Sequence, residues 1–277
     1  MVVTPARLVV AFALSLAGSV TLRIPAYGLP LDRDAAVYAV IGRALRGGAL
    51  PYVDLIDHKQ PLVYPVYAVI DLVAPGSAAA PRVVSALLAA IAATLVFALL
   101  RGGARGATAA VLVTVIGASR FVHGFDLNTE HLLLVTGTLA IAVALARPRA
   151  AFAVGALCGT AVLSKAVAVL LIPAALVPLA RGGGSWWRFA LGLAVPLVAV
   201  AALYVSHLDA LWDFNVAYNR EYASQLSVSD RIERLRGQGA VLALLAAATV
   251  AAVAVLRRRR DTLTVTLAVW LAGAVLG

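Results

Sequence analysis

The feature that most constrains this chain is a succession of long apolar runs separated by short polar connections. A helix needs about 20 predominantly apolar residues to cross the roughly 30 Å hydrocarbon core of a bilayer. The apolar runs occupy residues 7–24, 83–100, 106–119, 131–146, 150–163, 166–180, 189–205, 240–256 and 262–277. With 62% hydrophobic and 13% charged residues, the composition excludes a soluble globular domain of this length. We predict an all-α, polytopic transmembrane helical bundle in the plasma (inner) membrane, in which residues 1–277 form a single module of about nine helices.

The arginines predict how this bundle is oriented. With the N-terminus inside, the following arginines all lie on the cytoplasmic side: Arg7, Arg101, Arg105, Arg147, Arg149, Arg181, Arg188 and Arg257 to Arg260. The same side contains a single acid, Asp261, so its connections are strongly positive, as the positive-inside rule requires. The remaining cations and acids balance, so the net charge of +10 belongs to the cytoplasmic face, where anionic headgroups attract it. No nucleic-acid partner is needed to explain this charge.

Three segments need separate treatment. The stretch Pro61 to Ala74 contains Pro65 and Asp71, and a crossing there would invert every later connection, so we predict an interfacial or re-entrant segment. The long segments 25–82 and 206–239 then lie on the extracytoplasmic side. The last apolar run reaches the final residue without a polar tail, which leaves C-terminal truncation of a longer protein as an open alternative.

The first extracytoplasmic segment contains an amphipathic pattern followed by a polar loop. The apolar residues at helical spacing are Ala35, Tyr38, Ile41 and Leu45. They predict a short helix from Asp34 to Leu45 that ends at Gly47-Gly48. Asp34 is then either the N-cap of this helix or a functional acid. The loop brings Asp57, His58 and Lys59 together beside the membrane, where such polar side chains are costly unless they are solvated or used.

Lysine is rare in this chain. Of 23 cations, only Lys59 and Lys165 are lysines, and both lie on the extracytoplasmic side of the predicted topology. A lysine is a compact point charge that can approach a phosphate oxygen, and chance is the alternative explanation. Lys165 interrupts the apolar string GALCGTAVLSKAVAVLLIPAALV, where a cation costs a few kcal/mol unless it faces water, a partner or a ligand. A hairpin turn between two helices is the alternative there.

The remaining polar positions allow both structural and functional roles. In the turn RFVHGFDLNTEH, Asn128 is a candidate N-cap, and Glu130 either favours the helix dipole or is a second acid of a site. Segment 206–239, with Tyr218 and Asn219, suits the membrane interface or contact with a sugar or lipid. No tight ligand spacing connects the histidines, so we predict no cofactor and keep a divalent metal only as a weak alternative. The single cysteine, Cys158, is predicted to be a small packing residue.

These residues carry a resemblance to a known family. The string DRDAAVYAVIGRALRGGALPYVDLIDHKQPLVYP resembles the first extracytoplasmic loop of the GT-C glycosyltransferases, in particular the bacterial relatives of protein O-mannosyltransferases and of lipid A aminoarabinose transferases. FDLNTEHLL and GALCGTAVLSKAV resemble later signatures of the same group. The resemblance implies a cell-envelope enzyme that moves a sugar from a polyprenyl-phosphate donor to a lipid, glycan or protein acceptor outside the cytoplasm.

The resemblance also implies residue roles. Asp34 would be the catalytic base and Lys59 would hold the donor phosphate. Glu130 would be a later acid that orients the acceptor or Lys59, and Lys165 a second phosphate contact. The family often has Glu after the first-loop Asp, where this chain has Ala35, so either Asp32 replaces that acid or the acceptor class differs. The supporting residues would be Asp57, His58, Tyr218 and Asn219.

Two alternatives from other classes stay open. A transporter or flippase would use Asp34, Lys59, Glu130 and Lys165 to bind a solute or relay protons. It predicts inverted repeats, and no repeat is visible in the sequence. A catalytically inactive GT-C-like assembly partner would keep the fold without the activity. We favour the transferase because the charges cluster in outer loops.

Overall fold

The structure, a computed structural model, describes residues 3–119, 124–225 and 261–276 and the single positions 227, 229 and 233. Over these residues the chain is helical and contains no β-strand, which confirms the predicted all-α class. Four of the described helices are long and apolar enough to cross a membrane: Pro5–Ala26, Ala79–Leu99, Thr129–Ala146 and Trp186–Leu203. They support the predicted association of the chain with a membrane.

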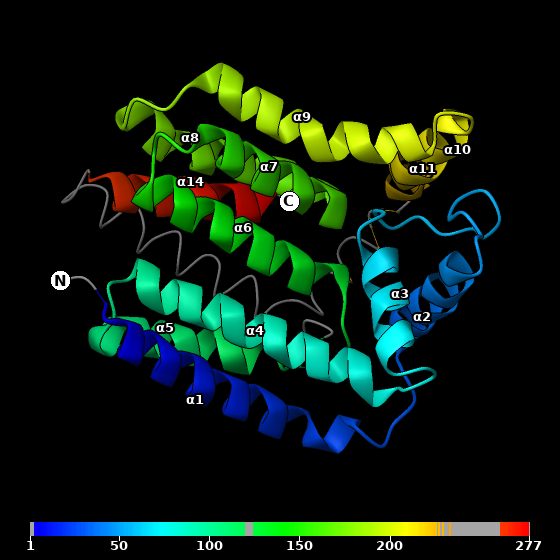
Figure 1. The fold of residues 1–277 in the computed structure, drawn as a ribbon, viewed down its shortest axis with the longest axis horizontal. Helices are drawn as coiled ribbons and strands as arrows, with labels where there is room; N and C mark the ends of the chain where they lie inside the picture. Colours follow the sequence, from blue (N-terminus) through cyan, green and yellow to red (C-terminus); the bar gives the residue numbers. More distant parts are fainter. Residues whose placement is uncertain are drawn as a thin grey trace.

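The helices form two groups (Figure 1). The bundle contains α1 (Pro5–Arg23), η1 (Ile24–Ala26), α4 (Ala79–Leu99), α5 (Gly103–Ile116), α6 (Thr129–Ala146), α7 (Ala151–Ser164), η3 (Ala166–Leu171), α8 (Ile172–Arg181), α9 (Trp186–Leu203) and α14 (Thr262–Leu276). The second group contains α2 (Arg33–Arg46), α3 (Val63–Val73), α10 (Leu208–Trp212), η4 (Asp213–Ala217) and α11 (Tyr218–Gln225). It covers one end of the bundle, on the right in Figure 1, which we call the loop end. The connections α4–α5, α6–α7 and α8–α9 lie at the opposite end, which we call the arginine end.

Several bundle helices are shorter than the predicted crossings. At about 1.5 Å per residue, the 14 residues of α5 and of α7 each fall short of a full bilayer core. The predicted run 240–256 lies outside the described residues. The predicted run 166–180 is not one helix, because the ring of Pro173 cannot continue an α-helix through the preceding turn. A 3-10 segment therefore precedes α8, which has this proline in its first turn. The count of nine crossings stays a prediction.

The stretch 61–74 forms α3, which lies beside α2 at the loop end rather than among the bundle helices (Figure 1). Two arginines of α2 hold it there. The Asp71 carboxylate lies 3.0 Å from a guanidinium nitrogen of Arg43 and 2.6 Å from one of Arg46. Tyr38 and Tyr67 add an edge-to-face ring contact between the two helices, with centroids 5.6 Å apart. The interfacial assignment of this segment stays a prediction, and its place outside the bundle agrees with it.

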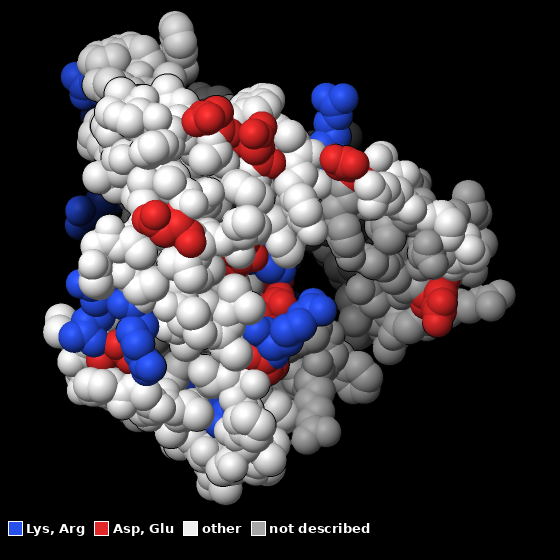
Figure 2. Space-filling view, turned by 90° about the vertical axis from the view of Figure 1, so that its right-hand side faces the viewer, with Lys and Arg blue, Asp and Glu red and all other residues white. Residues whose placement is uncertain are grey.

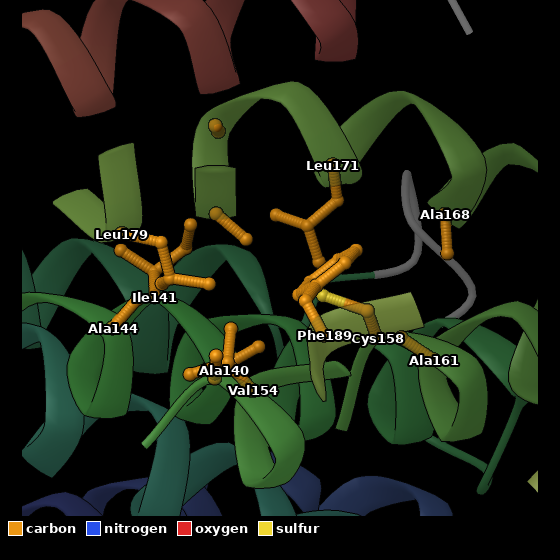
Figure 3. Close-up of a cluster of buried hydrophobic side chains, with 13 residues drawn as sticks. Ala140, Ile141, Ala144, Val154, Cys158, Ala161, Ala168, Leu171, Leu179 and Phe189 are labelled. Atoms are coloured by element: carbon orange, nitrogen blue, oxygen red, sulfur yellow. The ribbon is translucent and has the colours of Figure 1, made fainter. Parts of the chain in front are cut away.

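The core of the second half of the bundle lies between α6, α7, α8 and α9 (Figure 3). Cys158 is fully buried in it, which confirms the prediction that this residue serves packing. Helices α7 and α9 approach closely because glycines face the partner backbone. A Cβ atom added at Gly155 would overlap the carbonyl oxygen of Phe189, and one added at Gly192 would overlap that of Phe152. Small residues allow such close backbone contact between membrane helices.

Candidate functional site

The first turn of α2 separates two acids that the sequence leaves ambiguous. Asp32 is the N-cap, because its carboxylate accepts the backbone N–H of Ala35 at 2.8 Å. The alternative that Asp34 caps this helix is therefore wrong, and Asp34 is the second residue inside it. The spacing argument is otherwise confirmed: Ala35, Tyr38 and Ile41 are buried on one face, and the helix ends at Gly47. Asp32 is occupied as the cap, whereas Asp34 has 30% of its side chain exposed.

The Asp34 carboxylate forms an ion pair with Lys59. Its Oδ2 atom lies 2.9 Å from Lys59 Nζ, and the lysine side chain is 28% exposed. Partial burial raises the pKa of Asp34, but the hydrogen bond and charge of Lys59, and then those of Arg33, outweigh burial and lower it below the ordinary aspartate value. Asp34 is therefore ionised at neutral pH.

The loop that carries Lys59 is fixed through its backbone. Tyr52 Oη donates to the carbonyl of Lys59 at 2.6 Å, and Tyr64 Oη lies 3.3 Å from the same oxygen. Tyr64 also donates to Asp57 Oδ2 at 3.0 Å. The side chain of Asp57 is 9% exposed, so this acid is a structural support of the loop rather than an open group. These bonds leave the Lys59 ammonium at the surface while its main chain is held.

Segment 206–225 packs on the same loop. Asn219 Nδ2 donates to the carbonyl of His58 at 2.9 Å, and the ring of Tyr218 lies 5.1 Å from the imidazole ring of His58. Phe214 stacks on Tyr52 at 6.3 Å. Partial burial lowers the pKa of His58, and the neighbouring Lys59 charge acts in the same direction. His58, Tyr218 and Asn219 thus lie together beside Lys59, as supporting residues would.

A second pair lies where α6 begins and α7 ends. Lys165 Nζ lies 2.5 Å from Glu130 Oε1, and Thr129 Oγ1 donates to the other carboxylate oxygen at 3.1 Å. Lys165 adopts an extended backbone conformation between α7 and η3, so it does mark a break between helices. Both side chains are partly exposed, at 34% for the lysine and 48% for the acid. The ion-pair partner of Glu130 is therefore Lys165, whereas Lys59 pairs with Asp34.

Two contacts join the surroundings of the two pairs. Tyr38 Oη donates to Asn128 Oδ1 at 3.2 Å, which links α2 to the N-cap of α6. The Leu62 N–H donates to the carbonyl of Leu163 at 3.1 Å, which links the Lys59 loop to the end of α7. Burial, followed by the charges of nearby acids, raises the pKa of Tyr38. Figure 2 looks at this end and shows acidic and basic side chains beside one another at the edge of a hollow in the surface.

An apolar cavity of about 300 Å³ adjoins the second pair. Glu130 and Lys165 are its charged lining residues, and the other walls come from α6, η3 and α14. They include Leu134, Leu171 and Trp270. A cavity with apolar walls and one ion pair suits a molecule that has an apolar chain and a charged group.

Sequence reasoning missed the buried arginines that support this end. Arg82 is 1% exposed and lies 2.7 Å from the buried Asp126 carboxylate. It also donates to the carbonyls of Leu29 and Pro30, each at 2.8 Å. The pair joins the chain before α2 to the turn before α6, because Asp126 also accepts the N–H of Asp32 at 2.9 Å. The available signal was that this arginine directly borders an apolar run.

Arg23 is a second fully buried arginine, and it organises the start of α6. It donates to Ser85 Oγ at 3.1 Å and to the carbonyl of Gly117 at 2.7 Å. His131 lies 3.0 Å from the same serine oxygen, and its Nδ1 atom accepts the N–H of Asn128 at 3.3 Å. Asn128 is the N-cap of α6, as predicted. His131 therefore has a structural role next to Glu130.

Among the described residues, no group of three or more His, Cys, Asp or Glu side chains is arranged to hold a metal ion. His123 lies outside the described residues. Comparisons of the chain with protein families, with curated proteins and with solved structures find no match.

Proposed function

We propose that this chain is a membrane glycosyltransferase that resembles the GT-C enzymes and transfers a sugar from a polyprenyl phosphate to an acceptor hydroxyl at the loop end. The observation that carries the proposal is the contact of 2.9 Å between Asp34 and Lys59. It brings together an ionised acid and a lysine, both partly exposed, at one end of an apolar helical bundle. Those two groups are the ones that transfer from a lipid phosphate requires.

The ion pair explains how Asp34 would become a base only when the donor is present. While Lys59 contacts it, the pKa of Asp34 is lowered and the carboxylate is a weak proton acceptor. A donor phosphate competes for Lys59, because a lysine ammonium binds phosphate oxygens well. Movement of Lys59 towards the phosphate removes the main influence that lowers this pKa. Donor binding thereby raises the basicity of Asp34.

The transfer then follows as a single displacement. The acceptor hydroxyl gives its proton to the Asp34 carboxylate, and its oxygen forms a bond to the anomeric carbon of the sugar. The bond between that carbon and the phosphate oxygen breaks, and the electron pair stays on the phosphate. Lys59 compensates the charge that the leaving phosphate gains. One displacement inverts the anomeric configuration, without the covalent intermediate of a two-carboxylate retaining mechanism.

The second pair and its cavity fit the lipid part of the donor. Lys165 offers a second cation for the phosphate, and the apolar cavity of about 300 Å³ beside it offers a wall for an isoprenoid chain. Glu130 would hold Lys165 in place until the donor arrives. An assignment of Glu130 to the orientation of Lys59 is less favoured, because the distance of 2.5 Å joins it to Lys165.

The test is transfer of label from polyprenyl phosphates that carry tritiated mannose, glucose or aminoarabinose, in membranes that contain the full chain. We expect Asp34→Asn to lower transfer by about 100-fold or more, the range that general base catalysis contributes. Asp54→Asn is the matched control, because Asp54 lies in the same segment but accepts only a local bond from the Leu50 N–H at 2.7 Å. The control should transfer at the unsubstituted rate.

The outcomes separate the three functions. Equal transfer by the Asp34→Asn and Asp54→Asn proteins removes Asp34 as the base. No transfer from any donor, by protein shown to be folded, favours the inactive partner. Uptake of the labelled donor into the opposite leaflet without transfer favours a flippase.

A further inference from the structure

A second and larger cavity lies at the arginine end of the bundle. Its volume is about 1360 Å³, and its walls come from α4, α5, α6, α8 and the start of α14. Pockets for small molecules usually measure roughly 300–1,000 Å³. The space therefore suits a ligand larger than a metabolite. Because it lies at the end of the bundle opposite the loop end, it plays no part in the proposed transfer.

The lining of this cavity has two characters. Its apolar part includes Leu99, Ala142, Leu145, Leu263 and Leu267. Its basic part consists of Arg101, Arg105 and Arg181, which come from the α4–α5 connection, the first turn of α5 and the end of α8. All three arginines are exposed to solvent. A ligand that matches both parts has an apolar body and an anionic head.

Asp261 is an acid that also lines the cavity, and its carboxylate caps the helix that follows, α14. Its Oδ1 atom accepts the Thr264 N–H at 3.0 Å, and its Oδ2 atom accepts the Thr264 hydroxyl at 2.9 Å. These are the bonds of a helix cap. Among the described residues, the lining has three cations and one acid, so its charge is positive and suits an anion.

Two tryptophans that follow the lining residue Gly182 in the sequence indicate the depth of this end in a membrane. Trp186 and Trp187 begin α9, four residues after Gly182, and they are 76% and 53% exposed. Tryptophan is enriched at the level of lipid headgroups. The end of α8, which bears Arg181, thus lies at headgroup depth, while the walls at Ala142 and Leu267 lie about one turn further inside α6 and α14.

We propose that this cavity binds one anionic phospholipid. The phosphate lies among Arg101, Arg105 and Arg181, because guanidinium groups match phosphate oxygens in geometry and charge. The acyl chains lie along the leucine and alanine walls. Basic pockets between membrane helices bind anionic headgroups in this way.

The test is native mass spectrometry of the full chain, released from detergent micelles after addition of dioleoyl phosphatidylglycerol or dioleoyl phosphatidylcholine. We expect the unsubstituted chain to retain one phosphatidylglycerol and roughly tenfold less phosphatidylcholine. The triple variant Arg101→Gln, Arg105→Gln, Arg181→Gln should retain roughly tenfold less phosphatidylglycerol, since each arginine near an anionic headgroup contributes to binding.

The matched control removes the same charge at the same end. The variant Arg7→Gln, Arg147→Gln, Arg149→Gln changes three exposed arginines that do not line the cavity, and it should retain the lipid. Equal losses in the two triple variants would show attraction by surface charge and would overturn the proposal. Equal retention of the two lipids by the unsubstituted chain would do the same.

Two further arms complete the test. Millimolar inorganic phosphate should not displace the lipid, and displacement would reassign the arginines to a free phosphate ion. Ala142→Trp, which places a large ring in the apolar part, should lower retention without a change of charge. Circular dichroism establishes that each variant is folded, and the three single arginine variants replace the triple variant if it is not.

Discussion

At the scale of single residues, the two lysines have the same arrangement. Each stands against one carboxylate, Asp34 for Lys59 and Glu130 for Lys165, at 2.9 and 2.5 Å. Each pair is partly exposed, so solvent screens it and it contributes little to the stability of the fold. Side chains of this kind remain available to a ligand that offers a better partner.

The first prediction concerns the pH dependence of transfer. In Lys59→Met, the lysine no longer lowers the pKa of Asp34, while burial still raises it. Asp34 then keeps its proton up to a higher pH. The acidic limb of the profile of kcat/KM against pH therefore moves to higher pH. The measurement is that profile for a polyprenyl-phosphate donor to which the unsubstituted chain responds.

Arg33→Met is the control for this prediction. Arg33 also contacts Asp34, but at 3.4 Å and with 93% of its side chain exposed. Its removal should move the acidic limb less than the removal of Lys59. Identical profiles for the two variants would show that the ion pair does not set the ionisation of Asp34.

The sequence alone could identify these groups but not their partners. The sequence shows directly that two lysines occur in an arginine-rich chain and that acids precede an apolar run. The pairing of Glu130 with Lys165 depends on how α6 and α7 pack, and no local pattern encodes it. The distinction between Asp32 and Asp34 depends on where α2 begins to within one turn, and helix boundaries are read from sequence only to within a few residues.

At the scale of elements, the packing of α7 on α9 depends on glycine. Gly155→Ala should destabilise the fold by about 1–3 kcal/mol, because the new methyl group overlaps the carbonyl oxygen of Phe189 and the backbones must separate. Helix propensity alone predicts the opposite sign, since alanine favours a helix over glycine by about 1 kcal/mol. The measurement is the midpoint of thermal unfolding in detergent.

The control for this substitution is Gly28→Ala. An added Cβ atom at Gly28 meets no other atom within 4 Å, so the midpoint should stay within the error of the measurement. A higher midpoint for Gly155→Ala would contradict the close backbone contact between α7 and α9 at this glycine.

Predictions of helices succeeded where apolar residues recur at the helical spacing of three to four residues. The amphipathic spacing of 34–45 gave α2 almost to the residue, since its apolar face packs on α3 and its end is marked by Gly47. The run 166–180 is helical as well, but its first part is the 3-10 segment η3 ahead of Pro173, a change that uniform apolarity does not reveal. Apolarity measures the affinity of a segment for lipid, and it does not determine the backbone conformation of that segment.

At the scale of the whole molecule, the two ends of the bundle differ in chemistry. The loop end carries both acid–lysine pairs and the buried arginines, and the arginine end carries exposed arginines around the large cavity. The positive-inside rule predicts that the arginine end faces the cytoplasm. The order of the runs could be read from the sequence, whereas the buried roles of Arg23 and Arg82 required the three-dimensional contacts.

Labelling with a membrane-impermeant maleimide on intact cells tests this orientation. In a Cys158→Ala background, we expect Val53→Cys, at the loop end, to be labelled, and Ala104→Cys, next to Arg105, to be labelled only after the cells are opened. Both positions are exposed. Labelling of residue 104 on intact cells would contradict the predicted topology. It would also contradict the assignment of 61–74 as a segment that does not cross the membrane.

The backbone bond from Leu62 to Leu163 has a consequence for motion. It fastens the segment after Lys59 to the end of α7, so that segment cannot lift away as a flap. The Lys59 ammonium therefore meets a ligand by rotation of its own side chain, while its main chain stays against the bundle.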